Sequence, residues 1–194
     1  MIDRRVLFFG DSFVAGTGDP TALGWVGRVV AASHADRVPL TAYALGVRGQ
    51  SSVQVAARWH AEAQPRLDPA CDCRAVLSFG TNDSGVAAIA PERSEQTLAT
   101  MLDGAAVLGL QMLVVGPPPV GDAGRCERII ALSAAFAEVA ADRGVPFVGV
   151  IDALRVSRAW TREAAEGDGA HPAAGGYREL ARLVLAGGFV DWLR

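Results

Sequence analysis

LFFGDSF, residues 7–13, is an apolar run that ends in a glycine, a carboxylate and a hydroxyl. Residues 6–9 are all apolar, which predicts a strand covered on both faces, as in the middle of a parallel sheet. Gly10 lets the backbone turn sharply, so Asp11 and Ser12 follow at the carboxyl end of the strand, where open α/β sheets bind their ligands. Ser12 is therefore a candidate nucleophile.

The composition fits a globular protein with one core. The chain has 194 residues, of which 51% are hydrophobic, and this predicts a single domain spanning residues 1–194. The net charge is −3, from 18 basic and 21 acidic residues, and the basic residues form no stripe that would track phosphates. These features argue against a nucleic-acid partner.

All basic residues are arginine, because the sequence contains no lysine. Schiff-base enzymes, Walker-type nucleotide sites and serine–lysine dyads need a lysine amine, so these classes are excluded. Residues 1–6 lead into the first strand without an apolar leader, and no stretch approaches the roughly 20 apolar residues that span a bilayer. We therefore expect a soluble, cytoplasmic protein without a membrane span.

The three cysteines, Cys71, Cys73 and Cys126, are odd in number and form no disulfide framework. The pair Cys71 and Cys73 has the spacing of half a metal site, but no second pair of ligands lies nearby in the sequence. We interpret these residues as ordinary thiols and expect no metal site.

Strands and helices alternate along the chain. Apolar runs predict strands at residues 6–9, 38–44, 75–79, 112–115 and 145–150, and helical periodicity predicts helices at residues 23–33, 53–63, 92–108, 126–142 and 177–185. Residues 151–167 are less regular. This alternation predicts a flavodoxin-like three-layer α/β/α sandwich with a parallel sheet of about five strands in the order 2-1-3-4-5, which puts the Ser12 strand near the middle.

Polar loops should meet at one edge of this sheet. Neighbouring strands lie about 4.8 Å apart, so the loops at Ser12, at residues 46–49 and at Asn82 should emerge within roughly 10 Å of one another. Residues 151–167 are long enough to bring Asp168 and His171 to the same edge. There, His171 can take the Ser12 proton through Nε2 while the Asp168 carboxylate holds Nδ1–H, the geometry that a hydroxyl nucleophile requires.

The other two histidines, His34 and His60, lie near the carboxyl ends of their predicted helices, so we expect them away from the Ser12 edge. Purely structural interpretations stay open for the site residues. Ser12 alone is compatible with a helix cap, Asn82 with a turn, and His171 with a surface position. Their predicted convergence is what favours catalysis.

Three blocks of the sequence resemble SGNH hydrolases, the GDSL esterase and lipase family. Residues 10–12 match the nucleophile block, residues 80–83 the block with an oxyanion asparagine, and residues 168–172 the block with the acid and base. The resemblance spans the chain and implies hydrolysis of carboxylic esters through an acyl-enzyme on Ser12, without a cofactor or metal. It also implies an oxyanion hole formed by the backbone N–H groups of Ser12 and Gly49 and the side-chain amide of Asn82.

The glycine block matches less well. The family commonly has an asparagine five residues before the oxyanion glycine, and aligning this segment accordingly puts the glycine at Gly49 and Ala44 at the asparagine position. Gly46 is the competing candidate for the oxyanion donor. The missing amide raises the question of what braces this loop.

Two functions of other classes stay open. One is a flavodoxin-like module that binds a phosphate, nucleotide or flavin in the same crevice. The other is a magnesium-dependent phosphohydrolase using Asp11, Asp83 and Asp152, although we expect Asp11 to order its loop rather than react.

The substrate is less well defined by the sequence. The loops at residues 84–91 and 116–124 are short and rich in alanine, glycine and proline, which predicts a shallow, open pocket for small or short-chain esters. Lysophospholipids, thioesters and acetylated carbohydrates are alternative substrates on the same site. Nothing in the pattern indicates an oligomeric state.

Overall fold

The computed structural model describes residues 2–85 and 88–194, and its centre is a parallel sheet of five strands. The strands are β1 (Arg4–Gly10), β2 (Thr41–Gly46), β3 (Asp72–Ser78), β4 (Gln111–Val115) and β5 (Phe147–Val148). Their order is β2-β1-β3-β4-β5, and each neighbouring pair is parallel. Both the predicted sheet and the predicted strand order are confirmed.

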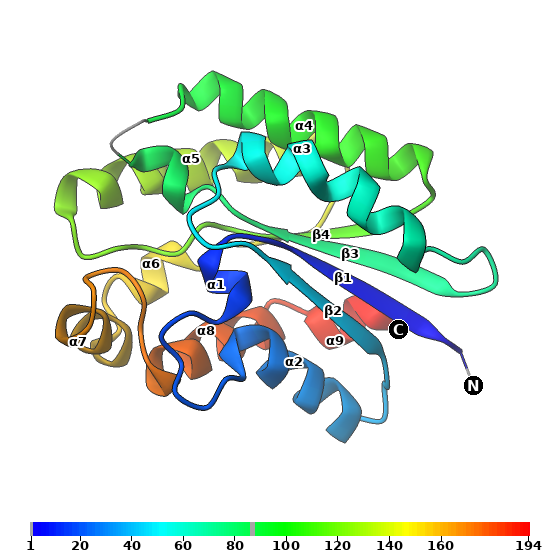
Figure 1. Ribbon diagram of the computed structural model, residues 1–194, viewed down its shortest axis with the longest axis horizontal. Coiled ribbons are helices and arrows are strands. Elements are labelled where there is room, and N and C mark those ends of the chain that lie inside the picture. The colour runs from blue at the N-terminus through cyan, green and yellow to red at the C-terminus, as the bar shows by residue number, and fades with distance from the viewer. Residues whose placement is uncertain (1, 86–87) are drawn as a thin grey trace.

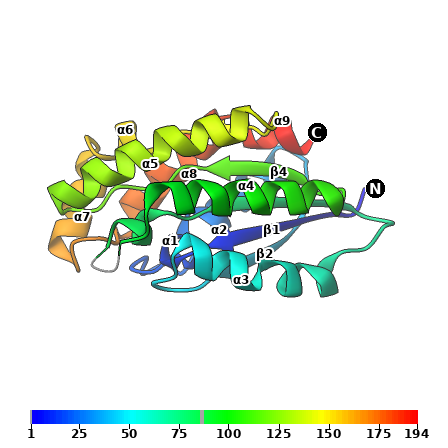
Figure 2. The same ribbon diagram turned by 90° about the horizontal axis from the view of Figure 1, so that it is seen from above.

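Helices cover both faces of the sheet, so the molecule has three layers (Figures 1 and 2). One layer contains α3 (Ser52–Ala63), α4 (Pro91–Val107) and α5 (Ala123–Ala141), and the other contains α2 (Gly24–Ala35), α8 (Ala174–Ala186) and α9 (Phe189–Leu193). Three further helices are α1 (Ser12–Ala15), α6 (Ile151–Leu154) and α7 (Arg158–Glu166), and single 3₁₀ turns occur at Gln64–Arg66 and Thr81–Ser84. Within the described residues, no helix has both the length and the apolarity needed to cross a membrane.

The first strand lies between two hydrophobic clusters, as its unbroken apolar run predicts. Phe8 packs into the cluster on the α2 and α8 side, where its ring meets Trp25 edge-on at 5.7 Å between centroids. Phe9 points to the opposite side, and its ring meets Trp59 of α3 at 6.4 Å. Because neighbouring side chains point to opposite faces of a strand, this run anchors both helical layers.

Several boundaries differ from the predicted ones. The second strand begins at Thr41 rather than at residue 38, since Pro39 has no N–H to donate to a ladder, and it continues to Gly46, which pairs with Gly10. The fifth strand is reduced to Phe147–Val148. Inside residues 151–167, which the sequence analysis left irregular, the chain forms α6 and α7.

The last helix, α9, was not predicted either, and it closes the edge of the molecule opposite Ser12. The Nε atom of Arg4, at the start of β1, donates to the Leu193 carbonyl oxygen at 2.8 Å. The Arg74 guanidinium bonds to the Trp192 carbonyl and lies over the Trp192 ring, 5.4 Å from its centroid. The start of the sheet and the last helix are thereby joined (Figure 1).

Candidate active site

Ser12 is the first residue of α1, separated from the end of β1 only by Asp11, and its side chain is buried. The turn between strand and helix is tight, because a Cβ atom on Gly10 would lie 2.0 Å from the Ser78 carbonyl oxygen of β3. Asp11 caps α1 by accepting the Phe13 N–H at 3.0 Å. Glycine and aspartate therefore hold the serine at the carboxyl end of the central strand.

Ser12, His171 and Asp168 form a continuous hydrogen-bonded series. The Ser12 Oγ and His171 Nε2 atoms are 2.7 Å apart, and the His171 Nδ1 and Asp168 Oδ2 atoms are also 2.7 Å apart. Serine and histidine are 159 positions apart in the sequence. The structure therefore brings together the three residues that the spacing arguments selected, in the order that proton transfer from a serine requires.

The second oxygen of Asp168 fixes the turn that carries the histidine. It accepts the backbone N–H of Ala170 at 3.0 Å and that of His171 at 2.9 Å. Partial burial opposes ionisation of this carboxyl group, but the hydrogen bonds from the His171 backbone, the His171 ring and the Ala170 backbone outweigh it and hold the Asp168 pKa well below its usual range. Asp168 is therefore an anion that can orient and stabilise a protonated imidazole.

Aromatic rings support the imidazole. The Phe13 ring lies 5.0 Å from the His171 ring, between centroids, and stacks on Trp160 of α7 at 5.8 Å. The Trp160 Nε1–H donates to the Pro119 carbonyl oxygen at 3.1 Å, so the stack is tied to the segment after β4. No motif marks Phe13 or Trp160 as a support in the sequence, although Phe13 follows the serine directly.

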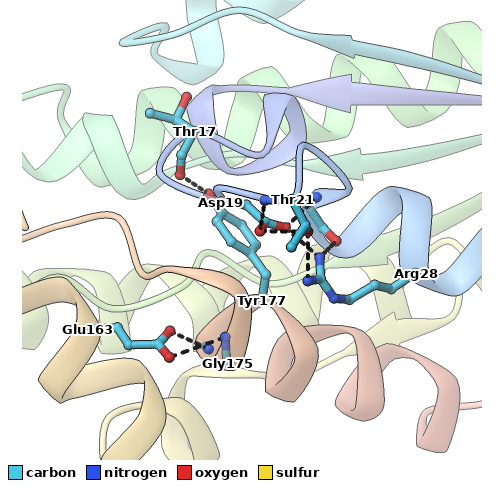
Figure 3. A network of polar contacts seen from close by, with 9 residues as sticks. Thr17, Asp19, Thr21, Arg28, Glu163, Gly175 and Tyr177 are labelled. Carbon is cyan, nitrogen blue, oxygen red and sulfur yellow. Dashed lines mark hydrogen bonds and ion pairs between the residues drawn. The ribbon is translucent and has the colours of Figure 1, made fainter.

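The loop between α1 and α2 forms a second support (Figure 3). The Tyr177 hydroxyl of α8 donates to the Thr17 carbonyl oxygen at 2.7 Å, and the buried Asp19 carboxylate pairs with Arg28 of α2. A Cβ atom on Gly18 would lie 3.1 Å from the His171 Cβ atom. The loop is therefore held by α2 and α8 while it lies directly against the histidine.

The first turn of α8 is capped from α7, which fixes the segment that follows the histidine (Figure 3). The Glu163 carboxylate accepts the backbone N–H of Gly175 at 3.2 Å and that of Gly176 at 2.7 Å. A carboxylate is favourable at a helix N-terminus, where N–H groups lack partners inside the helix. Pro172 lies just before Ala173, the N-cap residue of this helix.

Asn82 lies beside the nucleophile turn. Its Nδ2 atom is 3.3 Å from the Asp11 Oδ2 atom and 3.0 Å from the Gln50 carbonyl oxygen. The side-chain amide is therefore held between the β1 turn and the loop after β2. These contacts bring the three predicted loops together at one edge of the sheet.

The two glycines of the loop after β2 occupy different environments. Gly46 is the last residue of β2, and a Cβ atom there would lie 2.3 Å from the Ala15 backbone nitrogen, so it is needed for close packing against α1. Gly49 is exposed, has φ of +76°, and has open space around its Cα atom. Its backbone N–H, like that of Ser12, donates to no acceptor in the described parts of the chain. The geometry favours Gly49 as the free donor.

Two buried carboxyl groups lie behind the amide. Burial raises the pKa of Asp11 to about 7, and the nearby Asp83 adds to the effect, although the Phe13 N–H acts in the opposite direction. Asp83 accepts the Ser52 N–H at 2.8 Å and the Ser94 hydroxyl at 2.7 Å, which joins α3 to α4. Both groups have structural partners, as expected for Asp11.

Among the described residues, no third ligand joins these two carboxyls to complete the alternative metal site. Asp152 pairs with Arg155 on the surface of α6. Across residues 2–85 and 88–194, no group of three histidine, cysteine or acidic side chains is arranged to hold a metal ion. The arrangement at the sheet edge therefore fits acyl transfer better than metal-assisted hydrolysis. Elsewhere in the fold, the Sγ atom of Cys71 lies 3.1 Å from the Asp3 Oδ2 atom.

The other predicted features of this edge have mixed outcomes. Residues 116–120 are buried, and Gly121 donates to the Gly169 carbonyl oxygen at 2.8 Å, so this segment supports the Asp168 turn. The loop 84–91 includes residues 86–87, which lie outside the described residues. His34 contacts Leu40, just before the start of β2, at the far edge from Ser12.

Comparisons with known proteins agree with this architecture. The sequence model of the GDSL-like lipase/acylhydrolase family matches residues 8–179. No curated protein matches the chain. The fold is similar to solved structures of a lipase/acylhydrolase from Enterococcus faecalis, with 24% identity, 94% of each chain covered and a TM-score of 0.76.

Two further solved structures have the same fold. An acetylxylan esterase from Geobacillus stearothermophilus is 20% identical, with 98% of this chain and 96% of that chain covered and a TM-score of 0.76. A member of the lipolytic G-D-S-L family from Veillonella parvula is 19% identical, with 94% and 97% covered and a TM-score of 0.77. At these identities the similarity describes the fold.

Proposed function

Because the chain belongs to the GDSL-like lipase/acylhydrolase family, a family of carboxylic ester hydrolases, we propose that it hydrolyses esters of small or short-chain acyl groups with Ser12 as nucleophile. The observation that carries this proposal is the series of two 2.7 Å contacts from Ser12 through His171 to Asp168. A serine next to a neutral imidazole that is itself oriented by a carboxylate is an activated nucleophile.

The first half of the reaction forms an acyl-enzyme. His171 Nε2 takes the Ser12 hydroxyl proton as Oγ attacks the ester carbonyl carbon, and the carbonyl oxygen becomes an oxyanion. When the tetrahedral intermediate collapses, the bond to the alcohol oxygen breaks and His171 returns the proton to that oxygen. In the second half, His171 deprotonates a water molecule that attacks the acyl-enzyme, and the carboxylic acid leaves while Ser12 regains its proton.

The oxyanion needs donors that are in place before the reaction. The backbone N–H groups of Ser12 and Gly49 have no acceptor within the described chain, which leaves them free for this role. The Asn82 amide is already held by Asp11, and we expect its N–H toward the Gln50 carbonyl to be shared with the oxyanion. Fixed donors of this kind lower the barrier because they need no reorganisation during the reaction.

The test is a series of chromogenic esters, from acetyl to long acyl chains, assayed with the wild type and with Ser12→Ala and His34→Ala. We expect the wild type to prefer short chains, Ser12→Ala to lose several orders of magnitude in kcat/KM, and His34→Ala to retain wild-type rates, since it lies at the other edge. Equal rates for the wild type and Ser12→Ala would rule out Ser12 as nucleophile.

A second candidate is the removal of acetyl groups from carbohydrates by the same three residues. The acetylxylan esterase of the same fold supports it, because its substrate carries acetyl esters. Acetylated xylo-oligosaccharides should then release acetate faster than a simple acetyl ester with an equally good leaving group. A preference for long acyl chains would instead indicate a lysophospholipase or thioesterase.

A further inference from the structure

The loop that carries Gly49 has few hydrogen bonds between its own residues. Residues 47–51 connect β2 to α3 and contain no regular element. Within the loop, the Gln50 N–H approaches the Val47 carbonyl at 3.4 Å, a long contact. Ala44, five residues before Gly49, has only a methyl group where a bracing amide would be expected. The support for this loop must therefore come from elsewhere in the fold.

Arg58, two turns into α3, reaches this loop from outside. Its Nη2 atom donates to the Gly10 and Leu45 carbonyl oxygens, both at 2.9 Å. Its Nε atom donates to the Gln50 Oε1 atom at 2.6 Å. A single guanidinium thus joins the last residue of the nucleophile strand, the end of β2 and the residue after Gly49.

The same contacts continue to the oxyanion amide. Gln50 is bonded through its side chain to Arg58 and through its carbonyl oxygen to the Asn82 Nδ2 atom at 3.0 Å. The Gly10 carbonyl also accepts the Val47 N–H at 3.1 Å, at the other side of Gly49. Both flanks of Gly49 are therefore fixed to atoms that Arg58 contacts.

From these contacts we propose that Arg58 is a positioning residue, which holds residues 45–50 and thereby sets the Gly49 N–H and the Asn82 amide for the oxyanion. This inference rests on the proposed ester hydrolysis. The arginine supplies from α3 the donors that Ala44 lacks. It does not touch the substrate, so its effect passes through the loop.

The chemistry of the side chain suits this role. Guanidinium has five N–H donors in a rigid plane, so it can bond to several carbonyl oxygens at once, whereas a lysine amine is a flexible point donor. The Arg58 side chain is only 16% exposed, and its Nη1 atom pairs with Glu62 at 3.0 Å. A partly buried charge with four partners keeps its conformation, which is what an oxyanion donor needs from its support.

The test compares Arg58→Met with Arg66→Met on short-chain esters. Arg66 is a matched control, because it bonds to the Glu62 carbonyl and lies over Tyr43, and no hydrogen bond or ion pair among the described residues joins it to residues 45–50. We expect Arg58→Met to lower kcat about 10- to 100-fold with KM changed less than about threefold, since a displaced donor weakens only the transition state. Arg66→Met should keep kcat near the wild-type value.

A boronic acid with a short alkyl chain gives a second readout, because its adduct with Ser12 is tetrahedral and places an oxygen where the oxyanion forms. Its affinity should fall in parallel with kcat in Arg58→Met and stay unchanged in Arg66→Met. If Arg58 only stabilised the fold, Arg58→Met would lower the melting temperature, but kcat and the affinity for the boronic acid would not fall together. Wild-type kcat in folded Arg58→Met would overturn the proposal and leave the ester hydrolysis standing.

If Arg58→Met does not fold, Gln50→Ala tests the same link. In this variant the Arg58 guanidinium keeps its other partners, the Gly10 and Leu45 carbonyls and Glu62. It should lower kcat in the same direction, and unchanged kcat would count against the proposal. If instead the wild type and Ser12→Ala hydrolyse esters equally, the proposed function fails. In that case amide hydrogen exchange of residues 46–50 tests whether Arg58 holds the loop. Faster exchange in Arg58→Lys than in Arg66→Lys supports this role, and equal exchange overturns it.

Discussion

Replacing Asp19 with asparagine should remove a stabilisation that exists at neutral pH and disappears in acid. The Asp19 carboxylate is buried and accepts the Thr21 N–H at 3.0 Å, the Thr21 hydroxyl at 2.8 Å and the Gly24 N–H at 2.9 Å, besides its ion pair with Arg28. Burial alone would raise its pKa, but the bonds from Arg28 and Thr21 outweigh it and lower the pKa to about 2.

The size of the effect follows from that pKa. The usual value for aspartate is 3.8, so the folded state binds the Asp19 proton more weakly than the unfolded state does. A depressed pKa stabilises the fold above the unfolded value, and the stabilisation is lost as pH falls through the folded value. The separation from 3.8 to about 2 corresponds to about 2 kcal/mol at pH 7, of which about half remains at pH 3.

Urea unfolding at several pH values between 7 and 2.5 measures this directly. The gap in unfolding free energy between wild type and Asp19→Asn should narrow by about 1 to 2 kcal/mol over that range. Asp103→Asn is the control, because Asp103 pairs with Arg143 at an exposed position where ion pairs contribute little. A gap for Asp19→Asn that stays constant from pH 7 to 2.5 would refute the reasoning.

Two further predictions concern the oxyanion donors. Asn82→Ala should lower kcat about 10²- to 10³-fold in steady-state kinetics, with a smaller effect on KM, and unchanged kcat would remove Asn82 from the proposed mechanism. Gly46→Ala should lower the melting temperature strongly or abolish soluble expression, because its Cβ atom would lie 2.3 Å from a backbone nitrogen of α1. A Cβ atom on Gly49 would have open space, so Gly49→Ala should lower the unfolding free energy by only about 1–2 kcal/mol, for its positive φ. If Gly49→Ala were the less stable of the two variants, Gly46 would not be the glycine required for close packing.

The fold was predictable because its strongest signals are local. The apolar run before Gly10 identifies a strand buried on both faces, and parallel strands connected by helices end at one edge of a sheet. This topology alone brings Ser12 and Asn82 to one place, whichever boundaries are used, and the connection after β5 is long enough to bring His171 there. Errors of a few residues at β2 and β5 therefore did not affect the site.

The supports of the site were not predictable in the same way. Arg58 and Asp19 occupy positions where a charged residue normally faces solvent, and half of their partners are backbone atoms, which carry no sequence signature. The helix α7 is mostly polar and buries only Trp160 and Ala164, so few apolar residues mark it in the sequence. The sequence therefore indicated the reacting groups, while the groups that hold them became visible only in three dimensions.

The proposed nucleophile belongs to the opening strand, whereas its base lies on a turn that is held in place by α7 and α8. Hydrolysis would consequently require the last quarter of the polypeptide to be docked on the sheet, even if every strand were intact. If heat or denaturant detached this last quarter, the enzyme would lose its activity while most of its secondary structure persists. Turnover of a simple ester would then serve as a sensitive gauge of this docking.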